Sequence, residues 1–385
     1  MISERSGTIL SNARVVLHDR VIERGWVAIA DGAIAEVGEG NAPERGEDMG
    51  GDLVMPGLIE LHTDHLEAHY MPRPKVYWDA VAAVVSYDGQ LATSGITTVL
   101  DSLRLWSEEG VEGVDGQANV LASAITAARD GNLLRADHLL HLRCEIPTPR
   151  VVEEAKELIE RPDIRLMSLM DHTPGQRQFR DEGKLRDYYR GKTGGLTDAQ
   201  LDVMFAQRIE YQKKYAAKNM RDIVALAHSH NVPLASHDDT TDENVSDAIR
   251  DRVSVAEFPT TMEAARGLHQ AGIRVLMGAP NVVRGGSHSG NIAAVDLARE
   301  GLLDIMSSDY VPSSLLMAAM QLPKHAPVID LAAAVRTVTK TAAEAVGLND
   351  RGEIVAGKRA DVIRVHMAKD LPVVRSVWRE GNRVA

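Results

Sequence analysis

The chain contains the stretch Met55-Pro56-Gly57-Leu58-Ile59-Glu60-Leu61-His62-Thr63-Asp64-His65, in which an apolar run ends in potential metal ligands. The run predicts a buried strand over 58–62, and because side chains alternate along a strand, His62 and Asp64 share one face. The same arrangement recurs, with apolar runs that end at Glu145, His172, His237 and Asp309. If these runs are strands of one parallel barrel, their C-terminal ends meet on the face where barrel enzymes keep their chemistry.

The middle of the chain alternates between apolar runs and helical patterns. The predicted strands are 58–62, 96–100, 139–145, 164–172, 233–237, 253–258, 273–278 and 304–309. The predicted helices between and after them include 79–93, 116–130, 150–160, 261–271 and 330–346. This alternation predicts an α/β fold, and a (β/α)8 TIM-like barrel is more economical than an open sheet.

Both ends of the chain differ from this middle, because they consist of short strand patterns broken by turns. The predicted end strands are 8–17, 26–30, 34–37, 354–355, 361–365 and 373–378. We therefore predict a small β-sandwich domain built from residues 1–54 and 351–385. The catalytic barrel would occupy residues 55–350, with a long insertion around 173–230 between two of its strands.

Composition excludes several other classes of protein. The 385 residues carry a formal net charge of −12, which argues against a nucleic-acid partner. No apolar run reaches the roughly 20 residues of a membrane span, and the N-terminus lacks the apolar stretch of a secretory signal. Cys144 is the only cysteine, which fits a reducing cytoplasm. These features predict a cytoplasmic globular protein without a membrane partner.

The residue types at the strand ends are those that hold divalent metal ions. The predicted ligands are His62, Asp64, Glu145, His172, His237 and Asp309. Mixed nitrogen and oxygen ligation suits zinc, or alternatively manganese or iron, and the number of donors suggests two ions. Asp309 would accept the proton of the metal-bound water, because a metal lowers the pKa of that water from about 15.7 towards about 7. A metal-dependent hydrolase is the function that this pattern predicts.

Two segments, 55–64 and 352–362, resemble the first-strand motif and the C-terminal hairpin of the amidohydrolase superfamily. The resemblance covers nearly the whole chain and implies the same barrel and metal chemistry. It also implies that Glu145 bridges two metals. The usual first-strand pattern is His-x-His, whereas this chain has His62-x-Asp64.

A second departure from the superfamily concerns the later histidines, which usually come from strands five and six. Here His172 ends strand four and His237 ends strand five, while strand six offers Glu257. Either this strand count is off by one or the site is rearranged. Whether Cys144, His65 or Glu257 also binds metal stays open.

A narrower resemblance lies in five further segments, which are 71–75, 170–179, 235–239, 256–261 and 277–291. They resemble the diphosphatases that cleave α-D-ribose 1-methylphosphonate 5-triphosphate in the carbon–phosphorus lyase pathway of bacterial phosphonate degradation. This resemblance implies a small phosphorylated sugar as substrate. It also implies that metal-bound hydroxide attacks the α-phosphorus, which gives the 5-phosphate plus pyrophosphate.

Such a substrate is strongly anionic, so cations and backbone N–H groups are expected around the site. The predicted substrate contacts are Arg73, Lys75, Arg177, Glu257, Arg284, Gly285, Gly286 and His288. The segment 284–291 follows strand seven and precedes a helix, where barrel enzymes often hold phosphate. Residues 173–192 hold six Lys and Arg against three Asp and Glu, so a substrate-covering lid is one hypothesis and a solvated excursion the other.

Two other functions compete with hydrolysis of a phosphoric anhydride. The same metal site could act on a carbonyl carbon, as in a cyclic amidase, deaminase or deacetylase, because the spacing of the ligands does not choose phosphorus over carbon. A catalytically silent barrel that serves as a scaffold is the third hypothesis, and it conflicts with the complete set of potential ligands. The sequence is compatible with a homo-oligomer and does not fix its size.

Overall fold

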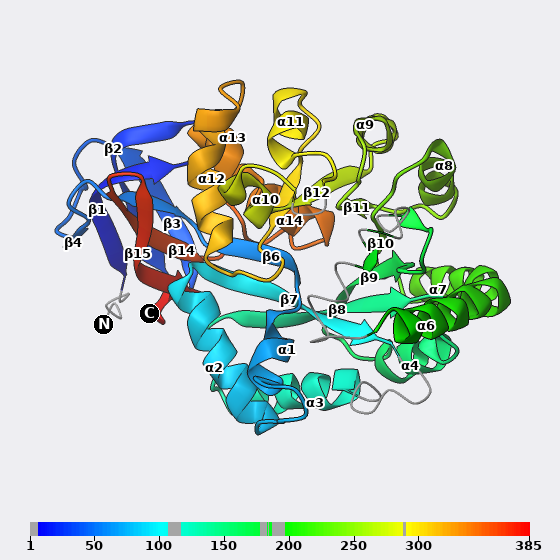
Figure 1. Cartoon of the computed structure of the whole chain (residues 1–385). Helices are drawn as coiled ribbons and strands as arrows, with labels where there is room; N and C mark the ends of the chain where they lie inside the picture. The colour runs from blue at the N-terminus through cyan, green and yellow to red at the C-terminus, as the bar shows by residue number, and fades with distance from the viewer. Residues whose placement is uncertain (1–6, 107–116, 178–182, 184, 187–196, 288–289) are drawn as a thin grey trace.

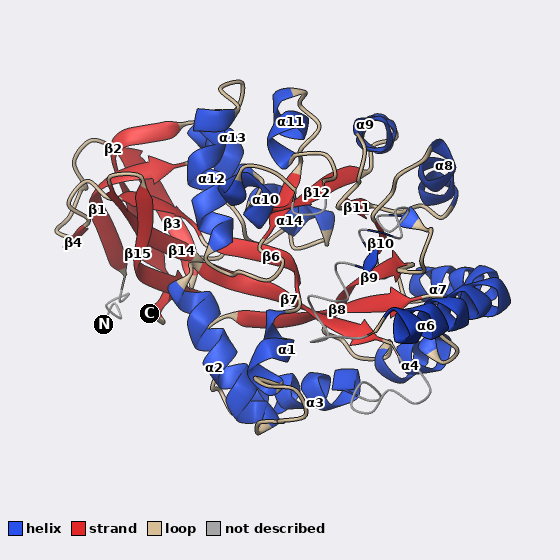
Figure 2. Ribbon diagram, in the orientation of Figure 1, coloured by secondary structure: helices blue, strands red, loops and turns tan. Residues whose placement is uncertain are grey.

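The centre of the computed structural model is a sheet of eight parallel strands in chain order, surrounded by helices (Figures 1 and 2). The structure describes residues 7–106, 117–177, 183, 185–186, 197–287 and 290–385. The strands are β6 (Leu58–Thr63), β7 (Ile96–Leu105), β8 (Asp137–Glu145), β9 (Ile164–Met170), β10 (Leu234–His237), β11 (Val255–Glu257), β12 (Arg274–Gly278) and β13 (Ile305–Ser307). A parallel bridge between Thr63 and Asp309 joins the first and last strands. The predicted barrel is confirmed.

Both faces of these strands are apolar, which explains their near-continuous hydrophobic runs. One buried cluster collects residues from β6, β7 and β9 through β13 and continues into α14 (Lys340–Ala345); its members include Ile59, Leu100, Val255 and Ile305. The opposite faces pack against the surrounding helices in a second, larger cluster. Two-sided burial fixes the strands firmly, so the side chains at their C-terminal ends are held on a rigid frame.

The ends of the chain build a second sheet at one side of the molecule, where blue and red strands lie together in Figure 1. Its strands are β1 (Thr8–Val16), β2 (Val21–Ala30), β3 (Ala33–Glu39), β4 (Glu47–Asp48), β5 (Leu53–Pro56), β14 (Val362–Ala368), β15 (Leu371–Arg379) and β16 (Asn382–Arg383). β5 pairs with β1 and β14, so it joins the N-terminal strands to the C-terminal ones. The predicted β structure from both termini is confirmed, although residues 354–355 form a loop rather than a strand.

Gly57 is the single residue between the two sheets, because β5 ends at Pro56 and β6 begins at Leu58. A Cβ atom at this position would lie 2.2 Å from Oγ1 of Thr97 on β7, well inside van der Waals contact. Only glycine therefore lets the chain pass from the terminal sheet into the barrel this close to the neighbouring strand. The close approach of Thr97 thus explains why the first-strand motif has a glycine at this position.

Helices follow most of the barrel strands. They are α1 (His65–Tyr70), α2 (Ala80–Thr93), α3 (Gln117–Asp130), α4 (Val151–Leu158), α6 (Asp198–Tyr211), α7 (Ala217–Ser229), α8 (Asp242–Arg250), α9 (Met262–Gln270), α10 (Ala279–Arg284), α11 (Ala294–Arg299), α12 (Ser314–His325), α13 (Leu331–Arg336) and α14. A π-helical turn, η2 (Gln212–Ala216), joins α6 to α7. Every helix in the described residues is too short or too polar to cross a membrane.

The predicted helix over 330–346 is wrong in one respect, because it is broken between α13 and α14. Thr337 and Thr339 donate their hydroxyl hydrogens to the carbonyl oxygens of Ala334 and Val335, at 2.7 and 2.8 Å. Such side-chain bonds compete with the helical backbone ladder. The break lets α14 turn across the end of the barrel, where its alanines join the apolar cluster inside the strands.

A buried ion network ties α2 to the barrel at the opposite ends of the strands. His138 lies 2.8 Å from Asp101 and 3.4 Å from Asp88, and all three side chains are almost completely buried. Burial alone would lower the pKa of His138, but the Asp101 and Asp88 carboxylates outweigh it and raise the pKa to about 9. His138 is therefore charged at neutral pH and neutralises part of two buried carboxylates.

Replacing His138 should destabilise the protein in a pH-dependent way. A pKa raised on folding contributes stability below the unfolded value of 6.5, and this contribution fades as the pH rises through about 9. His138→Gln should cost about 3 kcal/mol or more near pH 6.5, because it leaves the buried Asp101 carboxylate without its cationic partner. The thermal midpoint of the variant and of wild type, measured from pH 6.5 to 9.5, should converge as the pH rises. His325→Gln, on an exposed helix end, is the control, and a gap independent of pH would contradict the ionised network.

Candidate metal centre

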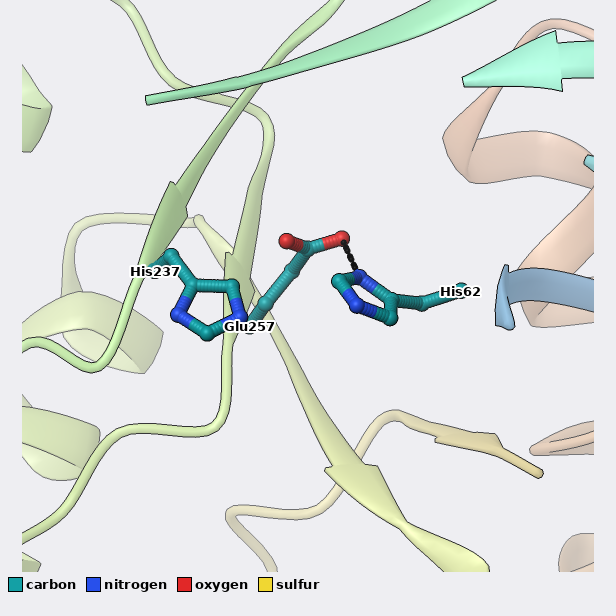
Figure 3. Close-up of side chains that lie close together, drawn as sticks. All are labelled: His62, His237 and Glu257. Atoms are coloured by element: carbon teal, nitrogen blue, oxygen red, sulfur yellow. Dashed lines mark hydrogen bonds and ion pairs between the residues drawn. The ribbon is translucent and has the colours of Figure 1, made fainter. Parts of the chain in front are cut away.

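Three side chains from the ends of three strands meet in the barrel mouth (Figure 3). His62 is the penultimate residue of β6, His237 ends β10 and Glu257 ends β11, and ligand atoms of all three lie within 4.8 Å of one another. The Glu257 carboxylate stands between the two imidazole rings, with Oε1 2.9 Å from Nδ1 of His62. The ring centroids of the two histidines are 5.5 Å apart. Residues far apart in the sequence thus form one buried donor cluster.

The protonation states of His62 and Glu257 favour the binding of a cation. Burial, followed by the positive charge of Arg143, lowers the pKa of His62 well below its usual value, so its ring is neutral. A neutral ring that donates from Nδ1 to Glu257 keeps the lone pair of Nε2 for a metal ion. Oε2 of Glu257 is buried and makes no hydrogen bond among the described residues. A buried carboxylate oxygen without a partner is costly unless a cation meets it, so these donors fit a divalent metal.

A second donor group shares His237 with the first. Ligand atoms of His172, His237 and Asp238 also lie within 4.8 Å of one another. Asp238 lies 2.9 Å from Nδ1 of His237 and 3.9 Å from Nε2 of His172. Because one histidine belongs to both groups, two neighbouring ions are compatible with the arrangement.

Glu145 orients His172 rather than standing apart from it. Its carboxylate accepts hydrogen bonds from the His172 backbone N–H at 2.7 Å and from Nδ1 at 2.5 Å. Burial would raise the pKa of Glu145, but the contacts with His172 outweigh it and lower the pKa to about 2. The indole of Trp106 stacks on the other side of this histidine, with ring planes 16° apart. His172 therefore has a fixed ring orientation although it lies two residues beyond the end of β9.

Tight backbone turns aim these side chains into the mouth. Asp238, Phe258 and Asp309 follow the ends of β10, β11 and β13, and each has a positive φ near 55° to 57°. The N–H of Asp238 still bonds to the next strand, at the carbonyl of Glu257, and that of Phe258 bonds to Leu276, both at 2.8 Å. Left-handed backbone at residues other than glycine is strained and gathers at functional sites. At Asp238 and Phe258 the left-handed conformation ends the strand but keeps the backbone hydrogen bond to the neighbouring strand.

Asp64 lies in a different environment from the two donor groups. Its carboxylate is 3.1 Å from the Arg143 guanidinium and 3.4 Å from that of Arg104. Burial raises its pKa, but Arg143 and Arg104 outweigh that effect, so the pKa of Asp64 is lowered overall. Its neighbour His65 points elsewhere, with Nε2 3.1 Å from Gln90 on α2. The structure thus joins Asp64 to two arginines, and its role as a metal ligand stays a prediction.

Asp309 lies close to Asp64, two residues after the end of β13. Burial, and then the Asp64 carboxylate, raises the pKa of Asp309 to about 7. A carboxylate that titrates near neutrality can accept a proton and return it under ordinary conditions. Its place next to β6 follows from the closing bridge with Thr63. This environment suits the general-base role that the sequence predicts for Asp309.

The structure gives the predicted phosphate contacts unequal positions. Arg177 donates to Asp239 at 2.7 Å and to the His237 carbonyl oxygen at 2.5 Å, so it braces the end of β10. Arg73 and Lys75 lie on the exposed loop that follows α1. Most of the lid hypothesised over 173–192, including 178–182 and 187–192, lies outside the described residues, as does His288.

The expected phosphate cradle at Gly285 and Gly286 is not at the start of a helix. α10 begins directly after β12, so Gly285 is the C-cap of that helix, with φ 82° and a left-handed conformation. The C-terminal end of a helix dipole is negative and disfavours an anion. The expectation that this segment directly follows strand seven is therefore wrong, because the short helix α10 lies between them. The segment does precede a helix, α11, and its contacts with phosphate stay a prediction.

Cys144 and His141, the two other residues of β8 that the sequence offered as possible site residues, lie in different environments. Cys144 is buried among the apolar side chains between the barrel and its helices, and burial raises the pKa of its thiol. Its apolar packing agrees with a core role. His141, on the same face as Glu145, has its ring centroid 5.2 Å from that of His62 and hydrogen-bonds to the Leu61 carbonyl at 3.0 Å. It therefore supports the first strand from within the barrel.

Sequence reasoning missed three residues of this centre. Arg143 is buried in the mouth, and it shares the face of Glu145 because it stands two residues earlier on β8. The alternation of side chains along β8 could therefore have identified Arg143 from the sequence. Asp238 adjoins a predicted ligand, but its turn conformation is what brings it in. Arg208 reaches Trp106 from α6, with its guanidinium carbon 4.8 Å from the ring centroid, and no local pattern predicted this contact.

A parallel barrel with buried histidines and carboxylates gathered at the C-terminal ends of its strands is the arrangement of a metal-dependent barrel enzyme. The sequence profile of the amidohydrolase family matches residues 53–384. The chain belongs to this family and is a hydrolase. The strand count is also settled, because β9 and β10 are strands four and five. The assignment of His172 and His237 as metal ligands after these strands stays a prediction.

Individual relatives agree with this assignment. The chain is 43% identical over 381 residues to α-D-ribose 1-methylphosphonate 5-triphosphate diphosphatase of Escherichia coli (strain K12), covering 98% of this chain and all of that protein. Among solved structures it resembles molinate hydrolase, with a TM-score of 0.66, 14% identity and coverage of 98% and 94%. It also resembles an adenosine deaminase from Xanthomonas campestris with bound zinc, with a TM-score of 0.60, 16% identity and coverage of 98% and 92%.

Removing the Glu257 carboxylate should release metal. Glu257→Gln keeps the shape of the side chain but removes the negative charge, so metal affinity should fall by about 10- to 100-fold. Metal per chain is measured by plasma mass spectrometry after dialysis against a metal buffer. Glu160→Gln, at an exposed position, is the matched control. Metal content equal to wild type in the Glu257 variant would remove this residue from the centre.

Proposed function

We propose that this enzyme hydrolyses α-D-ribose 1-methylphosphonate 5-triphosphate to the 5-phosphate plus pyrophosphate, as a step in phosphonate catabolism. The observation that carries the proposal is the 43% identity to the Escherichia coli diphosphatase, which extends over 98% of the chain and the whole of that protein. The similarity extends through both the terminal sheet and the barrel, so it includes the strand ends that carry the candidate site. A charged sugar phosphate as substrate also fits a cytoplasmic enzyme.

The charges in the barrel mouth support a phosphorus substrate. Arg143 is buried beside the donor groups, and Arg104 and Arg208 lie near the adjoining Trp106 ring. Within the described residues, hydrogen bonds of the Arg143 guanidinium go to Asp64 and, at 3.5 Å, to the sulfur of Met170. A guanidinium has five N–H donors, so others can meet phosphoryl oxygens.

The residues at the barrel mouth have different roles in the proposed hydrolysis. His62, His172, His237, Asp238 and Glu257 would hold divalent cations, with zinc, manganese or iron all suited to such donors. Bound cations would lower the pKa of water and neutralise charge on the triphosphate. Asp309 takes the proton from the attacking water and returns it to the leaving group. Arg143 stabilises the charge that grows on the oxygens of the α-phosphorus as pyrophosphate leaves.

Phosphorus NMR of the metal-loaded enzyme with α-D-ribose 1-methylphosphonate 5-triphosphate tests the reaction directly. Pyrophosphate and a sugar 5-phosphate should appear together, in equal amounts. Asp309→Asn should abolish most of this turnover, because an amide cannot accept the proton. Orthophosphate as the only released product would place the attack at the terminal phosphorus. No turnover with metal bound would reject the proposal and favour a carbonyl substrate, which the same centre could also serve.

Arg143→Met should lower kcat/KM by about 100- to 1,000-fold, which is the usual effect of removing a buried group that stabilises charge in the transition state. Arg143→Lys should retain part of the activity, and added guanidinium ion should restore part of it to the methionine variant. Arg375→Met, on the terminal sheet, is the control. Metal content is measured in parallel, because Arg143 also pairs with Asp64. Full activity in Arg143→Met would exclude the residue from catalysis.

A further inference from the structure

The first barrel strand is irregular at the point where it carries His62. Between Glu60 and Thr63 its pairing shifts, because three steps along β6 match only two steps along β7, from 99 to 101. β6 therefore contains one extra residue here, and Leu61 and His62 lack a partner residue on β7, which the structure describes in full. Such a bulge redirects a side chain, and bulges are frequent next to active sites.

Side chains from several strands hold the backbone of this bulge, because a bulge interrupts the ladder and its polar groups need other partners. The Leu61 carbonyl oxygen accepts a hydrogen bond at 3.0 Å, the Thr63 N–H donates one at 3.1 Å, and both polar backbone groups of His62 are bonded as well. The four partners are buried and come from β8, β7, β6 and β13; they are His141, Ser102, Glu60 and Ser307. The conformation of β6 at His62 thus depends on these side chains.

His141 has a defined protonation state in this arrangement. A carbonyl oxygen can only accept, so Nδ1 of His141 carries the proton that is donated to Leu61. Burial lowers the pKa of His141 to about 3, although the Glu257 carboxylate opposes this effect, so the ring is neutral. The lone pair of Nε2 then accepts the hydroxyl hydrogen of Ser168. Both ring nitrogens have partners, and the orientation of the ring is therefore fixed.

The same ring also contacts the donor cluster of the proposed metal centre. The His141 ring meets the His62 ring edge to face, with centroids 5.2 Å apart and planes at 77°. Its Nε2 lies 3.8 Å from Oε1 of Glu257, which is 2.9 Å from Nδ1 of His62. Because Nε2 of His141 carries no proton, it does not compete with His62 as the donor to this carboxylate. His141 thus fixes His62 both through the backbone of the bulge and through ring contact.

We propose that His141 is a positioning residue of the metal centre, which holds the bulge of β6 through the Leu61 carbonyl and thereby directs His62 towards Glu257. A buried polar network whose members all have partners makes its surroundings rigid, and a metal ligand needs such support. The inference rests on the proposed function, because the ions would serve that hydrolysis. Its test is the affinity for a metal ion, which is measured without substrate.

Two substitutions that place an N–H group differently test this role. The amide of His141→Asn offers an N–H near the position of Nδ1, whereas the amide of His141→Gln offers it near Nε2. Competition with a chelator measures the affinity of each variant for Co²⁺. His141→Gln should bind Co²⁺ about 10- to 100-fold more weakly than wild type, the usual effect of losing a residue that orients a metal ligand. His141→Asn should keep most of the affinity.

Leu142→Val is the matched control, because Leu142 is buried on the opposite face of β8 and does not touch the bulge. The visible absorption of bound Co²⁺ depends on the geometry of its ligands. It should change in His141→Gln and stay as in wild type in Leu142→Val, even where both variants lose thermal stability. A general loss of stability would not produce this difference.

Equal Co²⁺ affinity in wild type and His141→Gln, or equal losses in the two His141 variants, overturns the proposal. Ser102→Ala removes another side chain from the bulge and serves if the His141 variants do not fold; an affinity equal to that of Leu142→Val then has the same consequence, as does a wild type that binds no Co²⁺. If wild type binds Co²⁺ but does not hydrolyse the ribose triphosphate, the proposed function fails, and the affinities still decide the role of His141.

Discussion

The barrel depends on one buried carboxylate, that of Glu60, which holds the first strand to the last. Its oxygens accept hydrogen bonds from the backbone N–H of His62 at 2.7 Å and from the backbone N–H of Ser308 at 2.6 Å. The hydroxyl of Ser307 lies 2.7 Å from the same carboxylate. β13 has only three residues, so few backbone bonds are available to close the sheet. Burial raises the pKa of Glu60, and these hydrogen bonds oppose the rise.

Closure at Glu60 determines the chemistry because it fixes which side chains are neighbours. It places His62 at the end of the first strand beside Asp309 at the end of the eighth. From there the ladder runs through each strand in order, so that Glu257 and His237 arrive opposite His62. Glu257 ends strand six, where the superfamily usually has a histidine, and its carboxylate lies within hydrogen-bond distance of His62 Nδ1. In the proposed centre, the His62 ring keeps its other nitrogen for a metal.

The sequence predicted the positions of helices and strands better than it predicted contacts between side chains. Apolar runs identified all eight barrel strands, because burial on both faces leaves a local signature, and the strand ends then pointed to His62, His172 and His237. The pairing of Asp64 with Arg143 could not be predicted, because it depends on the directions of two side chains that are 79 residues apart in the chain. The helix C-cap at Gly285 was missed because α10 has only six residues, too few for a clear period.

The two kinds of positively charged group in the mouth have different structural origins, and this difference bears on their roles. Arg143 belongs to a barrel strand and is buried, so its position is as rigid as the metal-centre residues around it. Arg208 belongs to a helix outside the barrel, and its guanidinium lies over the Trp106 ring. A charge that must stabilise a transition state requires the first kind of support. Arg208 lacks this support, because a surface excursion can change while the strands stay intact. Of the two arginines, Arg143 therefore has the rigid placement that its proposed role at the α-phosphorus requires.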